Sequence, residues 1–220
     1  VLREVLAHQQ VGWQAFRFND DSFLADRERA LEICRLLAPL DVKFRIFSRA
    51  EDLTVPGVCE ALAQAGCVHV GVGIESLSPA MLARMAKPQR VSVIKQGLAQ
   101  ARDAGLLIRG FFIVGFPGET EATVSRTLDT LPDLALDEAT CYPCLPYPGS
   151  DLAVRPRAYG ITWIDPDYSQ YIQAGHDRAT GYVMATETFG PDDVRGWRDR
   201  FLEAFDRLGI AWCDQLGVAR

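Results

Sequence analysis

The stretch that decides the fold is R-G-F-F-I-V-G-F-P-G-E-T, at residues 109–120. It begins as an apolar run typical of a buried strand and ends in a turn marked by two glycines and a proline. We expect this turn to leave backbone groups bare. A second stretch, V-H-V-G-V-G-I-E-S at residues 68–76, has the same form and ends on a carboxylate. Ligands bind at this edge in barrels and open α/β sheets, so the pair predicts a small-molecule site.

Composition narrows the class of protein. Of 220 residues, 48% are hydrophobic and 24% are charged, which is typical of a globular domain with a sizeable core. The net charge of -6 argues against general binding to nucleic acid or to acidic membrane surfaces. No apolar run approaches the roughly 20 residues that a bilayer span needs. We expect a cytoplasmic protein without nucleic-acid or membrane partners.

The six cysteines are scattered along a chain that is too long to need disulfides, so we expect mostly free, buried thiols: Cys34, Cys59, Cys67, Cys141, Cys144 and Cys213. The close pair Cys141-x-x-Cys144 is expected to serve packing rather than metal binding. The chain begins with Val1 inside an expected helix and without a capping signal. This beginning indicates a fragment or a processed piece.

Apolar runs alternate with amphipathic stretches along the first two thirds of the chain. The pattern predicts strands over residues 13–18, 42–47, 68–74, 107–115 and 138–145. Helices are predicted over residues 2–10, 26–40, 55–65, 79–85, 91–104, 119–131 and 191–208. Such alternation predicts parallel strands with right-handed crossovers, in an α/β fold that forms an incomplete barrel or a curved sheet. Between residues 146 and 190 the pattern breaks into a segment rich in Pro, Gly and Tyr.

The carboxyl ends of parallel strands meet at one edge of a sheet. These ends carry Asp20 and Asp21, Ser48 and Arg49, Glu75 and Ser76, residues 115–118, and residues 141–146. We expect them to converge on one rim that suits a polar ligand. Glu75 is placed to accept two hydrogen bonds from vicinal hydroxyls, as acidic residues of dinucleotide folds do. Arg49 or Lys87 is a candidate partner for a ligand carboxylate.

Plainer interpretations of the same residues stay open. Glu75 is also placed to favour the start of the helix that follows Ser78-Pro79. Asp20 and Asp21 are equally suited to end a strand and cap the next helix. His69, inside an apolar strand, is typical of an interior histidine. An aromatic set either lines a pocket or packs as an extension: Tyr142, Tyr147, Tyr159, Trp163, Tyr168, Tyr171 and Tyr182.

Six short segments occur in an order that resembles a known family: F-N-D-D-S-F (18–23), S-R-A-E-D-L (48–53), G-I-E-S (73–76), M-A-K (85–87), G-F-F-I-V-G-F-P-G-E-T (110–120) and P-Y-P-G-S (146–150). Together they resemble the radical S-adenosylmethionine (SAM) enzymes, and most of all the subgroup fused to a cobalamin-binding domain. The resemblance covers residues 2–150. It implies a partial (β/α) barrel of parallel strands over residues 1–150, followed by a C-terminal helical extension over residues 151–220.

The resemblance also implies a set of SAM-binding positions. These are Glu75 with Ser76 at the ribose hydroxyls, Gly115, Phe116 and Pro117 against the adenine, Asp20 and Asp21 at the edge facing the methionine moiety or the substrate, and Lys87 and Arg49 as cations for the carboxylate. The implied chemistry is reductive cleavage of SAM to a 5′-deoxyadenosyl radical, which abstracts hydrogen from a small-molecule substrate. The implied cofactors and partners are SAM, a [4Fe–4S] cluster, cobalamin for methyl transfer, and an electron donor such as flavodoxin or ferredoxin.

One departure from the family pattern concerns the cluster. The family signature C-x-x-x-C-x-x-C occurs nowhere in the sequence, so no metal site is expected in this chain. Residues 2–10 resemble the helix that follows the signature loop, and we expect the cluster ligands upstream of Val1. The alternative is a degenerate barrel without a cluster, which acts as a binding or scaffold protein.

Overall fold

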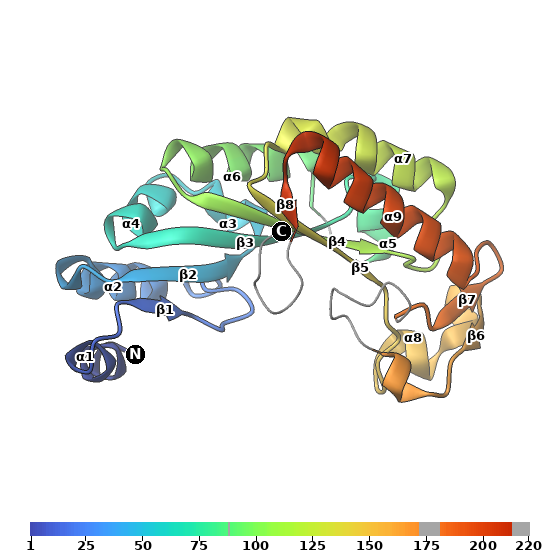
Figure 1. Cartoon of the computed structure of the whole chain (residues 1–220), viewed down its shortest axis with the longest axis horizontal. Coiled ribbons are helices and arrows are strands. Elements are labelled where there is room, and N and C mark those ends of the chain that lie inside the picture. Colours follow the sequence, from blue (N-terminus) through green and yellow to red (C-terminus); the bar gives the residue numbers. More distant parts are fainter. Residues whose placement is uncertain (88, 172–180, 213–220) are drawn as a thin grey trace. The chain divides into compact units, whose positions relative to one another are not determined.

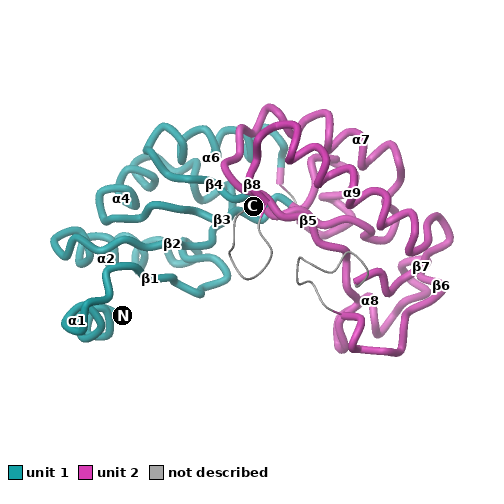
Figure 2. The backbone as a smooth tube through the Cα atoms, in the orientation of Figure 1, with its two compact units in different colours: residues 1–74, 90–110 teal, residues 75–89, 111–220 magenta. Residues whose placement is uncertain are grey.

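The computed structural model describes residues 1–87, 89–171 and 181–212. The chain divides into two compact units (Figure 2). Unit 1 comprises Val1–Ile74 and Arg90–Gly110, and unit 2 comprises Glu75–Gln89 and Phe111–Arg220. The expected division of the chain near residue 150 stays a prediction.

A six-stranded parallel sheet runs through the chain in the order β1-β2-β3-β4-β5-β8, which confirms the expected α/β fold. Its strands are β1 (Ala15–Arg17), β2 (Lys43–Ser48), β3 (Cys67–Glu75), β4 (Leu107–Val114), β5 (Glu138–Pro143) and β8 (Ala211–Trp212). Five of them match predicted strands. The short strand β8 was not predicted, and it pairs with β5 in parallel. None of the described helices is long and apolar enough to cross a membrane.

In unit 1 the strands β1, β2 and β3 lie side by side (Figure 1). Arg17 of β1 lies opposite Arg45 of β2, and Ile46 of β2 lies opposite Val70 of β3. The first strand is shorter than predicted, because the N–H of Trp13 donates to the carbonyl of His8 and so belongs to the end of the preceding helix.

The two faces of this part of the sheet differ. On β2 the side chains of Phe44 and Ile46 are buried, whereas those of Lys43 and Arg45 are exposed. This alternation has the period of two that an extended strand imposes. We call the face that carries Lys43, Arg45 and Phe47 on β2 and His69 on β3 the open face of unit 1.

The helices of unit 1 are α1 (Leu2–Gln10), α2 (Arg27–Leu37), α3 (Ala50–Leu53), α4 (Val58–Gln64) and α6 (Val91–Asp103). Two of them are shorter than predicted. The helix α2 gives way to a 3₁₀ turn at Ala38–Leu40, since Pro39 supplies no N–H to continue it. The helix expected over residues 55–65 begins only at Val58, because Gly57 adopts a left-handed conformation with φ of 80°.

In unit 2 the long helix α9 (Pro191–Leu208) packs on β5 and on α7 (Glu121–Thr130), as Figure 1 shows. The ring of Phe112 on β4 lies 5.6 Å from that of Phe201 and 6.0 Å from that of Phe205, measured between centroids. The buried guanidinium of Arg198 donates from Nε to the carbonyl of Cys141 at 3.1 Å. Apolar packing and a buried hydrogen bond therefore both hold α9 against the sheet.

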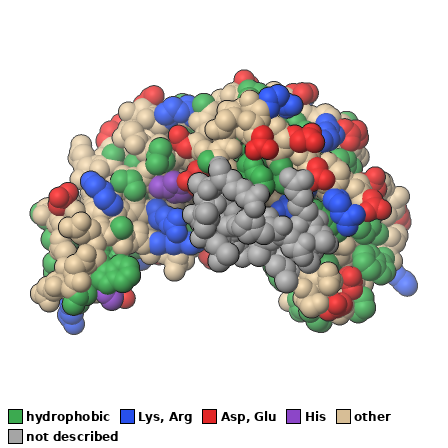
Figure 3. All heavy atoms as spheres, viewed as in Figure 1, with side chains coloured by type: hydrophobic (Ala, Val, Ile, Leu, Met, Phe, Trp, Pro, Cys, Tyr) green, Lys and Arg blue, Asp and Glu red, His purple; other side chains and the backbone are tan. Residues whose placement is uncertain are grey.

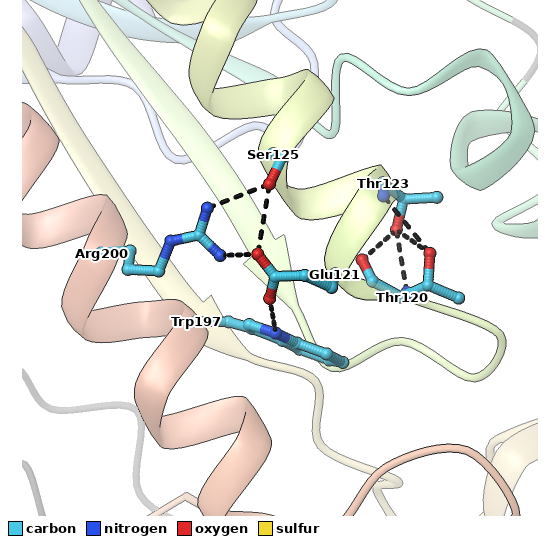
Figure 4. A network of polar contacts seen from close by, with 6 residues as sticks. All are labelled: Thr120, Glu121, Thr123, Ser125, Trp197 and Arg200. Carbon is cyan, nitrogen blue, oxygen red and sulfur yellow. Dashed lines mark hydrogen bonds and ion pairs between the residues drawn. The ribbon is translucent and has the colours of Figure 1, made fainter.

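A polar network joins α7 to α9 (Figure 4). One oxygen of Glu121 accepts from Nε1 of Trp197 at 2.9 Å, and the other pairs with Arg200. Arg200 also donates to the hydroxyl of Ser125 at 3.0 Å. The helix α7 begins at Glu121 rather than at the predicted residue 119, because Thr120 is its N-cap.

The segment without a readable pattern forms small elements of unit 2. It contains α8 (Asp151–Val154) and an antiparallel pair of strands, β6 (Ile161–Ile164) and β7 (Met184–Thr186). Further 3₁₀ turns occupy Leu131–Leu134, Pro156–Tyr159 and Tyr168–Gln170. Of the aromatic set, Tyr182 is buried beneath the guanidinium of Arg195 at 4.9 Å. This tyrosine therefore packs within the extension.

Candidate functional site

Glu75 is the last residue of β3 and has an unusual backbone conformation, with φ of 62°. A residue with a Cβ in this left-handed region carries strain of about 1–2 kcal/mol, and among the described residues Asp41, Ala86 and Ala135 share this conformation. The side chain is 19% exposed, and its Oε1 lies 2.6 Å from Nζ of Lys87. The helix-start interpretation is wrong for this residue, because Ser78 is the N-cap of α5 (Pro79–Arg84).

Ser76 follows Glu75 and is only 1% exposed. Its hydroxyl lies 3.1 Å from that of Thr127 on α7 and accepts from the N–H of Ser78 at 3.1 Å. Thr127 in turn accepts from the N–H of Leu77 at 3.1 Å. These bonds hold the connection between β3 and α5 against α7, so Ser76 fixes the turn on which Glu75 stands.

The turn after β4 carries the second predicted part of the site. Gly115 has φ of 80°, and a Cβ added there would lie 2.8 Å from the side chain of Val194 on α9, so only glycine fits without rearrangement. The N–H of Gly115 donates to Oε2 of Glu119 at 2.6 Å. The carbonyl of Pro117 accepts from Nε of Arg84 at 3.0 Å.

The expectation of bare backbone groups at this turn is therefore wrong for Gly115 and Pro117. Two charged side chains, Glu119 and Arg84, fold back onto the turn and satisfy its N–H and carbonyl groups. The ring of Phe116 in this turn is half-buried and so partly accessible to a ligand. The fixed geometry of the turn comes from these internal bonds.

Glu119 is a polar residue of this site that sequence reasoning assigned to the first turn of a helix. It is 3% exposed, and burial raises the pKa of its carboxyl to about 7, against the opposing effect of the N–H groups of Gly115 and Phe116. The signal was present in the sequence. An acidic residue that directly follows a turn at the end of a buried strand is in a position to bond back to that turn.

Unit 2 thus brings two of the predicted strand ends together. Arg84 and Lys87 lie at the end of α5 and just after it, and they bond to the turn after β4 and to the end of β3 respectively. Glu75, Lys87 and the turn at residues 115–117 therefore belong to one connected arrangement. Their roles in SAM binding stay predictions.

The remaining predicted site residues belong to unit 1. Asp20 forms an ion pair with Arg29 at 3.0 Å, Asp21 is exposed, and Arg49 lies 3.6 Å from Glu51. Neither Asp20 nor Asp21 caps α2, because Asp26 is its N-cap and accepts from the N–H of Arg29. The convergence of these three residues with Glu75 stays a prediction, as do their ligand contacts.

The described cysteines do not provide a cluster site. Cys34, Cys59, Cys67, Cys141 and Cys144 are free thiols, and Cys213 lies outside the described residues. Burial raises the pKa of Cys144 to about 12. Within residues 1–87, 89–171 and 181–212 no three His, Cys, Asp or Glu side chains gather as a metal site. These residues do not fit a [4Fe–4S] cluster.

Comparison with known proteins places this geometry in a family. The sequence model of the Radical SAM superfamily matches residues 1–131. An uncharacterized methyltransferase of Pyrococcus horikoshii is 32% identical over 149 residues, which is 67% of this chain and 32% of that protein. The bacteriochlorophyllide d C-12(1)-methyltransferase of Chlorobaculum tepidum is 27% identical over 178 residues, 78% of this chain and 39% of that protein. The chain spans about a third of the length of these curated relatives.

A solved structure shares the fold. It is the radical SAM methyltransferase TsrM of Kitasatospora setae, solved with cobalamin and a [4Fe–4S] cluster. The TM-score is 0.58 at 17% identity, over 90% of this chain and 39% of that one. The superfamily model covers more than half of the sequence, including five of the six segments that carry the resemblance. The chain therefore belongs to the radical SAM superfamily, whose members use SAM and a [4Fe–4S] cluster.

Proposed function

We propose that this chain is the catalytic-core portion of an enzyme that cleaves SAM reductively and so starts radical chemistry on a small-molecule substrate. Cobalamin-dependent methyl transfer is the outcome we favour, since both curated relatives above are methyltransferases and the fold matches one solved with cobalamin. The observation that carries the proposal is the strained, half-buried Glu75 held beside Lys87, in one arrangement with the turn after β4.

Glu75 is suited to bind the ribose of SAM. Lys87 holds its Oε1, and the contacts of the described residues leave Oε2 for an incoming hydroxyl. A carboxylate fixed in this way accepts hydrogen bonds without first losing side-chain freedom, which favours binding. The left-handed backbone of Glu75 sets the direction in which the carboxylate leaves the strand end.

The turn at residues 115–117 is suited to lie against a flat, apolar ring. Its N–H at Gly115 and its carbonyl at Pro117 are already bonded, so contact there is by surface rather than by a backbone donor. The half-buried Phe116 adds an aromatic face. We propose that this turn packs on the adenine of SAM, while Lys87 or Arg49 serves the methionine carboxylate and Asp20 and Asp21 face the methionine moiety or the substrate.

The proposal also includes an electron donor and a cellular location. Reductive cleavage requires an electron, which we propose comes from flavodoxin or ferredoxin in the cytoplasm. The cluster ligands are proposed to lie upstream of Val1 in the whole protein, because the sequence contains no C-x-x-x-C-x-x-C.

Titration of the purified chain with SAM tests the binding part of this proposal. We expect Glu75→Gln to weaken SAM binding by about 10-fold or more, since it removes a charged hydrogen-bond acceptor for hydroxyls. Glu203→Gln, on an exposed turn of α9, makes the same charge change and should leave the affinity unchanged. With dithionite as reductant we expect no 5′-deoxyadenosine from this chain alone.

Three outcomes contradict the proposal. Equal affinities for the two variants contradict the role of Glu75, and release of 5′-deoxyadenosine by the chain alone contradicts the placement of the cluster ligands. Absence of any saturable SAM binding favours the degenerate barrel that acts as a scaffold.

A further inference from the structure

The open face of unit 1 carries a row of basic side chains that the SAM site does not use. Arg17 on β1 lies directly opposite Arg45 on β2, and Arg45 lies opposite His69 on β3. Neighbouring strands are about 4.8 Å apart, so the two arginines stand on adjacent strands, with His69 on the strand after them. Arg109 on β4 is close enough for its charge to act on Arg17. We call Arg17 and Arg45 the arginine row.

The charges of this row are of one sign. Among the residues that the structure describes, neither Arg17 nor Arg45 forms an ion pair with a carboxylate, whereas Arg29, Arg35 and Arg49 of the same unit each do. Burial, together with the charges of Arg45 and Arg109, lowers the pKa of Arg17. Like charges directly opposite each other on a sheet are destabilising. Folding alone gives no reason to place them there.

The row is accessible and partly preorganised. Arg17 and Arg45 are both exposed. The guanidinium of Arg17 lies over the ring of Phe47, 4.8 Å from its centroid, which restrains it by a cation–π contact. In the view of Figure 3, Lys and Arg side chains gather beside a histidine over the part of the molecule where β2 and β3 lie.

From this arrangement we infer that the arginine row binds a small organic anion that carries two or more carboxylate or phosphate groups. Guanidinium groups recognise both kinds of group through paired N–H donors. Guanidinium groups on adjacent strands suit acidic groups that are spaced along a ligand. A ligand with one acidic group would leave part of the row uncompensated.

The assignment is to a small molecule rather than to a nucleic acid. The chain has a net charge of -6, so the row is a local exception on an acidic protein and not part of a broad basic surface. If the proposed function holds, the bound anion is the substrate of the radical reaction. This identification of the anion as the substrate rests on the proposed function, whereas anion binding itself does not.

Calorimetric titration of the chain with pyrophosphate and, separately, with citrate tests the inference, without SAM in either experiment. We expect saturable binding of at least one anion, weakened by about 10-fold or more in Arg45→Gln, because a charged hydrogen bond is lost. Arg35→Gln is the matched control, since Arg35 is an exposed arginine of α2 paired with Glu32. Affinity for the bound anion should fall as salt is raised. The stronger of the two titrants identifies phosphate or carboxylate as the recognised group.

Arg45→Lys separates geometry from charge, because lysine keeps the charge but loses the planar fork. We expect an affinity between those of the original chain and Arg45→Gln, with an unchanged circular dichroism spectrum in all variants. Absence of saturable binding for both anions, or equal loss in Arg45→Gln and Arg35→Gln, overturns the inference. Tighter binding of a short single-stranded RNA that also depends on Arg45 overturns the assignment to a small molecule.

Discussion

The two units differ in how their charged side chains are paired. In unit 2 the charged groups near the strand ends are satisfied by the unit itself: Glu75 by Lys87, Arg84 by the carbonyl of Pro117, and Arg198 by the carbonyl of Cys141. On the open face of unit 1, Arg17 and Arg45 lie side by side and form no ion pair within the described residues.

This difference separates the two proposed binding sites. Internal bonds fix the shape of the site in unit 2, so a ligand finds its contacts already in place. Among the described residues, Arg17 and Arg45 have no carboxylate partner, so an acidic ligand would supply one. The first arrangement suits recognition of one defined molecule by shape, and the second suits recognition of charge.

Glu119 gives the largest expected effect, because its carboxyl accepts hydrogen bonds from backbone N–H groups and forms no ion pair among the described residues. Burial raises its pKa in the folded chain to about 7, from a usual value of 4.5. Between these pH values the folded chain binds more protons than the unfolded chain, so stability falls as pH rises. Above pH 7 the loss is complete, and it amounts to at most about 3 kcal/mol.

Urea unfolding at about pH 5 and about pH 8 measures this loss when the chain is compared with Glu119→Gln, which does not titrate. We expect the original chain to lose more stability than the variant over this interval. Identical changes in the two proteins would mean that Glu119 is ionised throughout and that unit 2 compensates its charge fully.

Reversing one charge in each unit should change the free energy of unfolding in opposite directions. Lys87→Glu places a second carboxylate beside the half-buried Glu75 and should lower the free energy of unfolding by about 2 kcal/mol. Arg45→Glu places a carboxylate opposite Arg17 and should raise it by about 0.5 kcal/mol, since the new pair is exposed.

The measurement is urea unfolding of both variants at low salt. The gain in Arg45→Glu should shrink as salt is raised, because exposed pairs are screened. Loss of stability in Arg45→Glu similar to that in Lys87→Glu would show that the arginine row is compensated within the protein, contrary to the comparison.

An effect smaller than that of Lys87→Glu concerns the backbone of Glu75. Glu75→Gly and Glu75→Ala both remove the pair with Lys87, but only glycine relieves the left-handed conformation. The glycine variant should therefore be more stable than the alanine variant by about 1 kcal/mol. Thermal unfolding of the two variants measures the difference. Equal stability of the two variants would mean that the backbone of Glu75 is not strained.

Much of the fold was predictable, since periodicity reports on which face of an element is buried. The strands at residues 42–47, 68–74 and 107–115 and the helix at residues 191–208 appear close to their predicted bounds. Helix ends were less predictable, because they depend on single residues such as Gly57 and Thr120. The strands β6, β7 and β8 were not predicted. Short strands carry too few residues to show a period, and they exist only through their partners.

For the site, the sequence by itself determined which residue types stand at the strand ends, and its ordered segments determined the superfamily. It did not determine what those residues contact. Only the tertiary structure decided that Lys87 holds Glu75, that Arg84 and Glu119 close the turn after β4, and that Arg17 and Arg45 lie side by side. The physical reason is that secondary structure follows from local periodicity, whereas side-chain pairing depends on register and on the packing of segments far apart in the chain.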